Sequence, residues 1–172
     1  MRWRVRRAGP DDASALALVA SASFLETYAT ELAGADIVAH CLKNTTSELF
    51  TRWTSDPETI VTIAEHAPGH APIGYTVLTA PDFPLDTRPT DIELRRIYIL
   101  QQMQGTGLGK ALMARAHEDA AAIGRTRILL GVYEHNYRAH AFYESQGFAR
   151  IGERRFAVGA ATYTDPVYSR GV

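Results

Sequence analysis

The sequence predicts an α/β fold (α+β by some schemes), built on a twisted, mixed sheet of six to seven strands with about four helices around it. Residues 93 to 133 read as a strand, a glycine-rich turn, a helix and a second strand, an arrangement that makes the two strands parallel. Residues 148 to 170 read as two successive strands that pair antiparallel. The 172 residues fit one domain, residues 1–172.

The N-terminal half begins with a short strand and an amphipathic helix capped by Asp11 or Asp12. The apolar positions of this helix recur on one side, at Leu16, Val19, Ala20, Phe24 and Tyr28. The elements expected here are strand 3–7, helices 12–30 and 36–51, strands 59–65 and 73–78, and the proline-rich loop 81–90.

The C-terminal half contains the parallel unit and the antiparallel pair. Gly124 suits the C-terminal cap of the helix that follows the glycine-rich turn. The elements expected here are strand 93–99, a helix that runs to residue 123, strand 127–133, helix 136–146, and strands 148–153 and 162–170.

Composition excludes several classes of function. The formal charge of −1 predicts no binding to nucleic acid or to an anionic membrane. Cys41 is the only cysteine and the six histidines lack metal-ligand spacing, so we expect no metal. Residues 1–24 are similar to a signal peptide, but Pro10-Asp11-Asp12 interrupts them and the helical stripe continues past residue 24. We therefore expect a cytoplasmic protein.

The most informative segment is Glu93 to Lys110, ELRRIYILQQMQGTGLGK, where glycines 105, 107 and 109 stand between a strand and a helix. Such a turn brings backbone N–H groups and a helix N-terminus to an anion, which suits a pyrophosphate. The spacing does not fit a P-loop, because Ala111 follows Lys110. A dinucleotide site stays open as an alternative, with Glu134 as its ribose-binding acid.

Two sets of residues form recognisable motifs. The first set is Gln104, Gly107 and Gly109, in the pattern Q-x-x-G-x-G. The second, which is the more specific, consists of Asn136, Ala139, Phe142, Tyr143, Gly147 and Phe148. Together they resemble the acetyl-CoA site of the GNAT N-acetyltransferases. The resemblance covers nearly the whole chain and implies the GNAT acyl-CoA N-acyltransferase fold.

A finer similarity rests on residues 24–28, residues 93–99 and the tail residues Phe156, Gly159, Thr164 and Asp165. Through these residues the chain resembles the bacterial PaiA-type, polyamine-acetylating branch of the family. This resemblance implies transfer of acetyl from acetyl-CoA to a polyamine such as spermidine or spermine. An amino acid, an antibiotic amine or a protein N-terminus remains as an alternative acceptor, as does a non-catalytic acyl-CoA-binding regulator. Such folds commonly dimerise, so a homodimer is compatible with the resemblance.

The resemblance also implies residue roles. The backbone of Ile97, Tyr98 and Ile99 would pair with the pantetheine arm, and one N–H there would stabilise the oxyanion. The pyrophosphate would be wrapped by Gln104, Gly105, Thr106, Gly107, Leu108, Gly109 and Lys110. The helix that follows the second strand would contribute Asn136, Ala139, Phe142 and Tyr143 to the cofactor site.

Tyr143 is the expected general acid, because a phenol stays protonated at neutral pH and can donate to the coenzyme A sulfur. Asn136 can equally serve as a helix N-cap. Glu93 and Glu134, at strand ends, are the two candidate general bases. A cationic acceptor could also be attracted by Glu26, Glu31 and Asp91, although the sequence does not show that these carboxylates converge.

Overall fold

The computed structural model describes residues 2–172, apart from the side chains of Phe156 and Val158. Phe156, one of the residues on which the branch resemblance rests, therefore has a side chain outside the described part. The strands are β1 (Trp3–Arg7), β2 (Ile60–His66), β3 (Ala71–Thr79), β4 (Asp91–Ile99), β5 (Arg127–Gly131), β6 (Ala149–Val158) and β7 (Ala161–Gly171). The α-helices are α1 (Ala13–Tyr28), α2 (Gly34–Asn44), α3 (Ser47–Ser55), α4 (Leu108–Ala122) and α5 (Tyr137–Ser145), and short 3-10 turns cover Pro10–Asp12 and Gln101–Met103.

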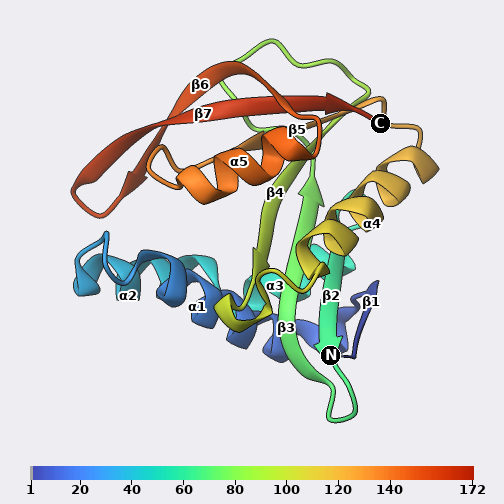
Figure 1. The fold of residues 1–172 in the computed structure, drawn as a ribbon, viewed down its shortest axis with the longest axis vertical. Helices are drawn as coiled ribbons and strands as arrows, with labels where there is room; N and C mark the ends of the chain where they lie inside the picture. The colour runs from blue at the N-terminus through green and yellow to red at the C-terminus, as the bar shows by residue number, and fades with distance from the viewer. Residues whose placement is uncertain (1) are drawn as a thin grey trace.

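All seven strands form one mixed sheet in the order β1-β2-β3-β4-β5-β7-β6, as Figure 1 shows. Only β4 and β5 run parallel; the other neighbours are antiparallel. The mixed sheet with one parallel unit confirms the expected fold class. Parallel neighbours need a crossover connection, and here the chain passes from β4 to β5 through α4, which packs on one face of the sheet.

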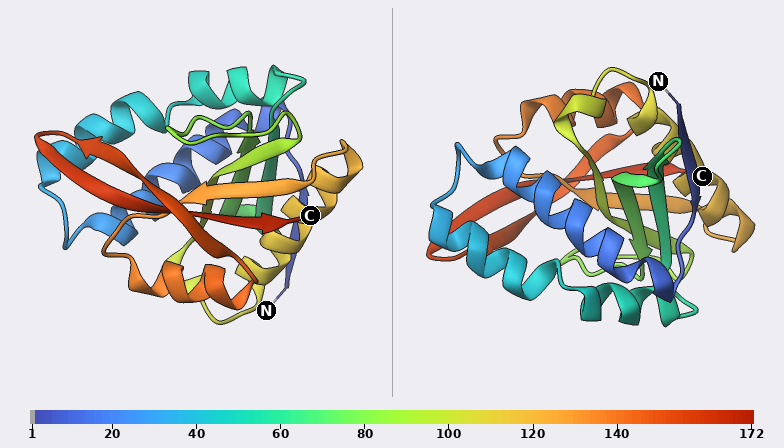
Figure 2. Two further views of the ribbon diagram at one scale, coloured as in Figure 1. Left: turned by 90° about the horizontal axis from the view of Figure 1, so that it is seen from above. Right: turned by 90° about the horizontal axis from the view of Figure 1, so that it is seen from below.

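The helices cover the two faces of the sheet unequally. Figure 2 shows α1 to α3 on one side of strands β2 to β4, with α4 and α5 on the other. On the α1 side the core includes Leu16, Val19, Phe50, Ile63, Tyr75 and Val77. On the α4 side it includes Ile92, Leu94, Met113, Ala116, Ile128 and Tyr143. The apolar stripe predicted for the first helix is therefore the stripe that is buried.

The range 36–51, predicted as one helix, contains two. The chain leaves the helical conformation at Thr45, whose φ is −130°, and Thr46 then caps α3 by accepting a hydrogen bond from the Leu49 N–H at 3.2 Å. Two adjacent threonines favour this break, since β-branched residues lose side-chain freedom in a helix and a threonine hydroxyl makes a good N-cap. The single-helix prediction was wrong for this reason.

No helix in the described range 2–172 has the length and apolar character that crossing a membrane requires.

Candidate functional site

The site begins where β4 and β5 separate. Their parallel pairing covers only three residue pairs, the last of which joins Glu93 to Leu129. On the other side of β4 the pairing with β3 continues to Ile99 and shifts register around Arg95, which has no partner across the strand. A bulge of this kind bends a strand and re-aims its side chains. Beyond residue 93, β4 therefore turns one backbone edge towards the gap.

The backbone direction along this edge follows from one hydrogen bond. The Leu100 N–H donates to the Ile73 carbonyl oxygen at 2.9 Å, towards β3. Because N–H groups alternate in direction along an antiparallel strand, the Tyr98 N–H also points to β3 and those of Ile97 and Ile99 point to the gap. Of the three residues predicted to contact the cofactor through their backbone, two thus offer an N–H group.

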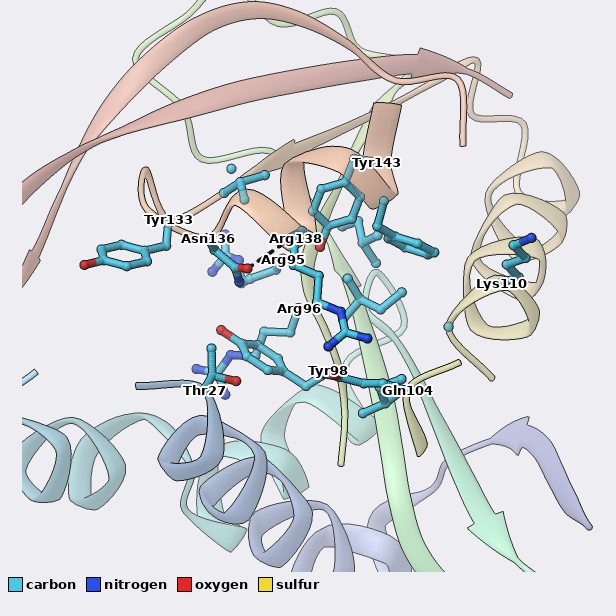
Figure 3. A pocket seen from close by; sticks show the side chains of 18 of the residues that line it. Thr27, Arg95, Arg96, Tyr98, Gln104, Lys110, Tyr133, Asn136, Arg138 and Tyr143 are labelled. Atoms are coloured by element: carbon cyan, nitrogen blue, oxygen red, sulfur yellow. Dashed lines mark hydrogen bonds between the residues drawn. The ribbon is translucent and has the colours of Figure 1, made fainter. Parts of the chain in front are cut away.

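A cavity of about 510 Å³ fills the gap (Figure 3). It is large enough for a ligand of coenzyme or drug size. Residues from α1, β4, the glycine-rich loop, the segment after β5 and α5 line it. They are Thr27, Tyr28, Leu94, Arg95, Arg96, Ile97, Tyr98, Ile99, Gln104, Gly105, Gly107, Gly109, Lys110, Gly131, Val132, Tyr133, Asn136, Arg138, Ala139, Phe142 and Tyr143.

The glycine-rich loop leads into α4 with free backbone donors. Gly105 and Gly107 have φ angles of 78° and 88°, in the left-handed region that favours glycine. In the described part of the chain, the first hydrogen bond of α4 joins the Ala111 N–H to the Gly107 oxygen at 3.1 Å. The N–H groups of residues 108–110 are consequently without a backbone acceptor, as expected for a helix start. They form a site that suits an anion.

Two predicted loop residues offer only their backbone. The side chain of Leu108 is fully buried in the core beside α4. The hydroxyl of Thr106 donates to the Met103 carbonyl oxygen at 2.7 Å. Gly109 lies beside the Phe142 ring, and an added Cβ would make an ordinary contact with it at 3.6 Å.

At the start of α5, Asn136 is both a cap and a wall of the cavity. Its side-chain oxygen accepts a hydrogen bond from the Ala139 N–H at 3.2 Å. The predicted N-cap role is therefore confirmed, and the same residue also lines the cavity beside Ala139 and Phe142.

Tyr143 projects from α5 with its hydroxyl directed into the cavity (Figure 3). Burial raises the pKa of Tyr143, and the neighbouring Tyr98 raises it further. Among the residues that the structure describes, none makes a hydrogen bond to the Tyr143 hydroxyl. The phenol therefore keeps its proton at neutral pH and has that proton free for donation.

The two candidate bases lie outside the cavity lining. Glu93 is 1% exposed and held by Arg95 at 3.3 Å, Arg154 at 3.5 Å and the Asp82 N–H at 3.0 Å. This differs from the solvated strand-end carboxylate that its position suggested. The Glu134 carboxylate accepts a hydrogen bond from the Thr164 N–H at 3.3 Å.

The three further carboxylates do not converge on the cavity. Asp91 pairs with Arg127 at 2.6 Å at the opposite end of the strand pair. Glu26 accepts a hydrogen bond from the Gln101 N–H at 2.8 Å. Neither of these residues nor Glu31 lines the cavity.

Sequence reasoning missed several residues of the cavity wall. Arg95, Arg96 and Arg138 line it, together with Tyr28 and Tyr133. Two adjacent arginines within the otherwise apolar run Leu94 to Ile99 were a detectable signal, since charged side chains are seldom placed in a central strand without a partner or a function.

Comparison with known proteins gives consistent results. The family model described as the acetyltransferase (GNAT) family matches residues 24–148. An uncharacterized N-acetyltransferase of Mycobacterium tuberculosis is 34% identical over 159 residues, which covers 92% of this chain and 97% of that protein. The PaiA N-acetyltransferase of Thermoplasma acidophilum, solved in complex with coenzyme A, is similar with a TM-score of 0.78 at 19% identity and full coverage of both chains. The ribosomal-protein-S18-alanine N-acetyltransferase of Escherichia coli has a TM-score of 0.72 at 14% identity, with 99% and 94% coverage.

Proposed function

The chain belongs to the acetyltransferase (GNAT) family, whose enzymes use acetyl-CoA, and we propose that it transfers the acetyl group to a primary amine by direct attack of the amine nitrogen. Because the chain belongs to this family, we no longer retain the alternative of a dinucleotide-binding site. The observation that carries the proposal is the continuity of the cavity, which joins the amides at the start of α4 to the Tyr143 hydroxyl across the open edge of β4.

The described residues fit acetyl-CoA, which supplies an acyl group activated as a thioester. The free N–H groups of residues 108–110 and the left-handed glycines before them provide donors for a diphosphate. The gap-facing N–H groups of Ile97 and Ile99 provide donors for an extended arm and for the carbonyl oxygen that gains charge. Loss of one such oxyanion donor typically costs about 2.7–4 kcal/mol of transition-state stabilisation.

In the transfer, the bond from the amine nitrogen to the acetyl carbon forms as the carbon–sulfur bond breaks. Tyr143 donates its hydroxyl proton to the departing sulfur, and the nitrogen releases one proton to solvent, from which Tyr143 regains its own. A buried phenol suits this role because burial favours its neutral, proton-carrying form. Fixing both reactants in one cavity contributes the larger share, about 7–11 kcal/mol in well-aligned systems.

Glu93 and Glu134 are proposed to assist removal of the amine proton through water. Neither lines the cavity, so direct contact with the amine is not part of the proposal. The Glu93 carboxylate is held in place by its ion pairs with Arg95 and Arg154.

The finer hypothesis for the acceptor is a polyamine, as the resemblance to the PaiA-type branch predicts. Similarity to the Thermoplasma PaiA at 19% identity supports the fold alone. The charges of the lining oppose this hypothesis, because Arg96, Lys110 and Arg138 line the cavity beside Arg95, which Glu93 neutralises, and no acid lines it among the described residues. A polycation would gain nothing from such a surface.

The test combines binding with turnover. Calorimetry should show coenzyme A binding to the purified protein, with NAD as the negative control. A thiol reagent should then detect free coenzyme A when acetyl-CoA is supplied with one member of a panel of polyamines, amino acids, antibiotic amines and peptide N-termini. Binding without thiol release from any amine would support the regulator alternative, and absence of binding would contradict the assignment of the cavity.

A further inference from the structure

Two adjacent arginines on β4 have opposite surroundings. Arg95 lies 3.3 Å from the Glu93 carboxylate, so its charge is compensated within the protein. Among the described residues, no carboxylate lies within ion-pair distance of Arg96. Both side chains line the cavity (Figure 3). Strand β4 therefore carries two adjacent cations, and among the described residues a carboxylate neutralises Arg95 but not Arg96.

The guanidinium of Arg96 is well packed but incompletely satisfied. Its central carbon lies 4.9 Å from the centre of the Trp53 ring, in a cation–π contact. It also acts on the buried Tyr75 hydroxyl, partly offsetting the rise that burial causes in the pKa of Tyr75. Its Nη1 atom is shielded from solvent and has no hydrogen-bond partner in the described part of the chain. An unsatisfied buried donor is unfavourable, and it leaves the charge of this guanidinium without a protein partner.

The neighbours of Arg96 do not supply the missing negative charge. His40, from α2, has a pKa lowered to about 4 by burial and by the Arg96 charge, so it is neutral at pH 7. The other groups around the guanidinium are the phenols Tyr75 and Tyr98 and the Trp53 ring, all uncharged at that pH. The positive potential at this wall is therefore uncompensated.

Arg96 belongs to the part of the cavity remote from the diphosphate donors. Tyr98 packs in the core cluster of the α1 face, and Arg96 lies over Trp53 of α3 on that same face. Ile97 and Ile99 point to the opposite face and pack beside Leu108 and Leu112 of α4, where the glycine-rich loop ends. Because side chains alternate between the two faces of a strand, β4 lies between the Arg96 side chain and the start of α4. Thr27 and Tyr28 of α1 complete the wall on the Arg96 side.

We propose that Arg96 binds the carboxylate of the amine acceptor, so that this enzyme acetylates small amino acids in preference to polyamines. A planar guanidinium held against an aromatic ring presents two parallel N–H donors, which match a carboxylate in a bidentate pair. The inference rests on the proposed function and names the substrate class for the same cavity. The carboxylate would pair with the part of the Arg96 guanidinium that lines the cavity, and it would place the amino group beside β4.

The first test measures kcat/KM for the standard amino acids, each matched by its methyl ester and by the corresponding decarboxylated amine, with spermidine and spermine in the same assay. The best amino acid should exceed its own ester and amine at least tenfold. Equal or better turnover of the ester, the amine or a polyamine overturns the proposal while leaving acetyl transfer to an amine intact.

The second test uses Arg96→Gln and Arg96→Lys. The glutamine variant should lower kcat/KM for the amino acid at least tenfold, mainly through KM, and change that for the methyl ester less than twofold. The lysine variant, which keeps the charge but loses the planar pair of donors, should lie between. Arg52→Gln, an exposed position on α3, is the matched control. An equal loss with amino acid and ester would reveal a purely structural role and overturn the proposal.

A binding measurement separates this inference from the proposed chemistry. With coenzyme A present, the wild-type melting temperature should rise with the N-acetylated amino acid and not with its methyl ester, and Arg96→Gln should abolish that difference. The measurement needs no turnover, so it applies even if no amine releases thiol. Coenzyme A affinity should be the same in wild type and variant, and stabilisation by acid and ester alike would overturn the proposal.

Discussion

A buried aspartate lies near each end of the β4–β5 pair, Asp91 of β4 at one end and Asp165 of β7 at the other, and their surroundings are opposite. At the paired end, Asp91 is 2% exposed and accepts hydrogen bonds from Arg127 at 2.9 and 2.6 Å. Burial acts to raise the pKa of Asp91, but Arg127 and the Arg88 N–H together hold it below its usual value. Beyond the open end, Asp165 is 3% exposed, and burial raises its pKa to about 6 even though the Glu134 N–H bonds to it at 3.2 Å.

The contrast shows how one strand pair serves two purposes. The paired end joins the strands through an ion pair and through the side chains of Thr90 and Thr126, 2.7 Å apart. The open end gives up strand pairing, and the groups there are arranged for ligands at some expense of stability. Substitutions at the paired end should therefore affect folding, and those at the open end should affect activity or even increase stability.

Asp91→Asn should produce the largest change. It removes the negative charge from the ion pair of the buried Asp91 with the half-buried Arg127, and breaking a buried pair typically costs about 3–5 kcal/mol of unfolding free energy. Because the folded pKa of Asp91 is lowered, the stabilisation is present at neutral pH and is lost as pH falls below the usual carboxyl range. Urea unfolding at pH 7 measures it. Glu153→Gln, in an exposed pair with Arg150, should cost under about 1 kcal/mol; similar losses from both variants would remove the special role of the paired end.

Asp165→Asn should change stability in the opposite direction. A carboxyl whose pKa rises from 3.8 to about 6 on folding favours the folded state at low pH, and this contribution is lost as pH rises through about 6. The difference of about 2 pKa units corresponds to roughly 3 kcal/mol. Asparagine can still accept the Glu134 hydrogen bond, so the variant should be more stable than wild type at pH 8 and nearly equal at pH 4. If the variant is less stable than wild type at pH 8, the ionised Asp165 carboxylate stabilises the folded state and the prediction is wrong.

Tyr143→Phe tests the open end directly. The variant should bind coenzyme A as wild type does but turn over at least tenfold more slowly, a barrier increase of about 1.4 kcal/mol. The reason is that phenylalanine keeps the packing of Tyr143 against Phe142 and Phe148 and loses only the proton donor. Single-turnover kinetics with the best acceptor would measure the chemical step. Unchanged turnover would remove Tyr143 from the mechanism.

Much of the fold was readable from the sequence, because its determinants are local. The apolar runs gave both parallel strands and the helix between them, and the spacing from Gln104 to Gly109 marked the start of α4. Asn136 was readable as an N-cap for the same reason, since a cap depends on a residue three positions away.

The open end depends on residues that meet only after folding. Glu93 looked like a solvated strand end because its partner Arg154 lies 61 residues away. Arg96 could not be recognised as uncompensated without knowing that Trp53 and His40, rather than an acid, surround it. The polyamine hypothesis came from a resemblance that carries no information on these contacts.

Gly107→Ala should give the smallest effect and refine the comparison within the open end. Gly107 precedes α4 with a φ of 88°, where an alanine is strained by about 1 kcal/mol, although an added Cβ meets no atom within 4 Å. Gly34→Ala, at the start of α2, also meets no atom within 4 Å and has no positive φ, so it is the matched control. Urea unfolding should show the loss in Gly107→Ala alone, and calorimetry should show weaker coenzyme A binding alongside it. If stability falls and binding does not, the loop conformation serves the entry into α4 and the diphosphate contact must lie elsewhere.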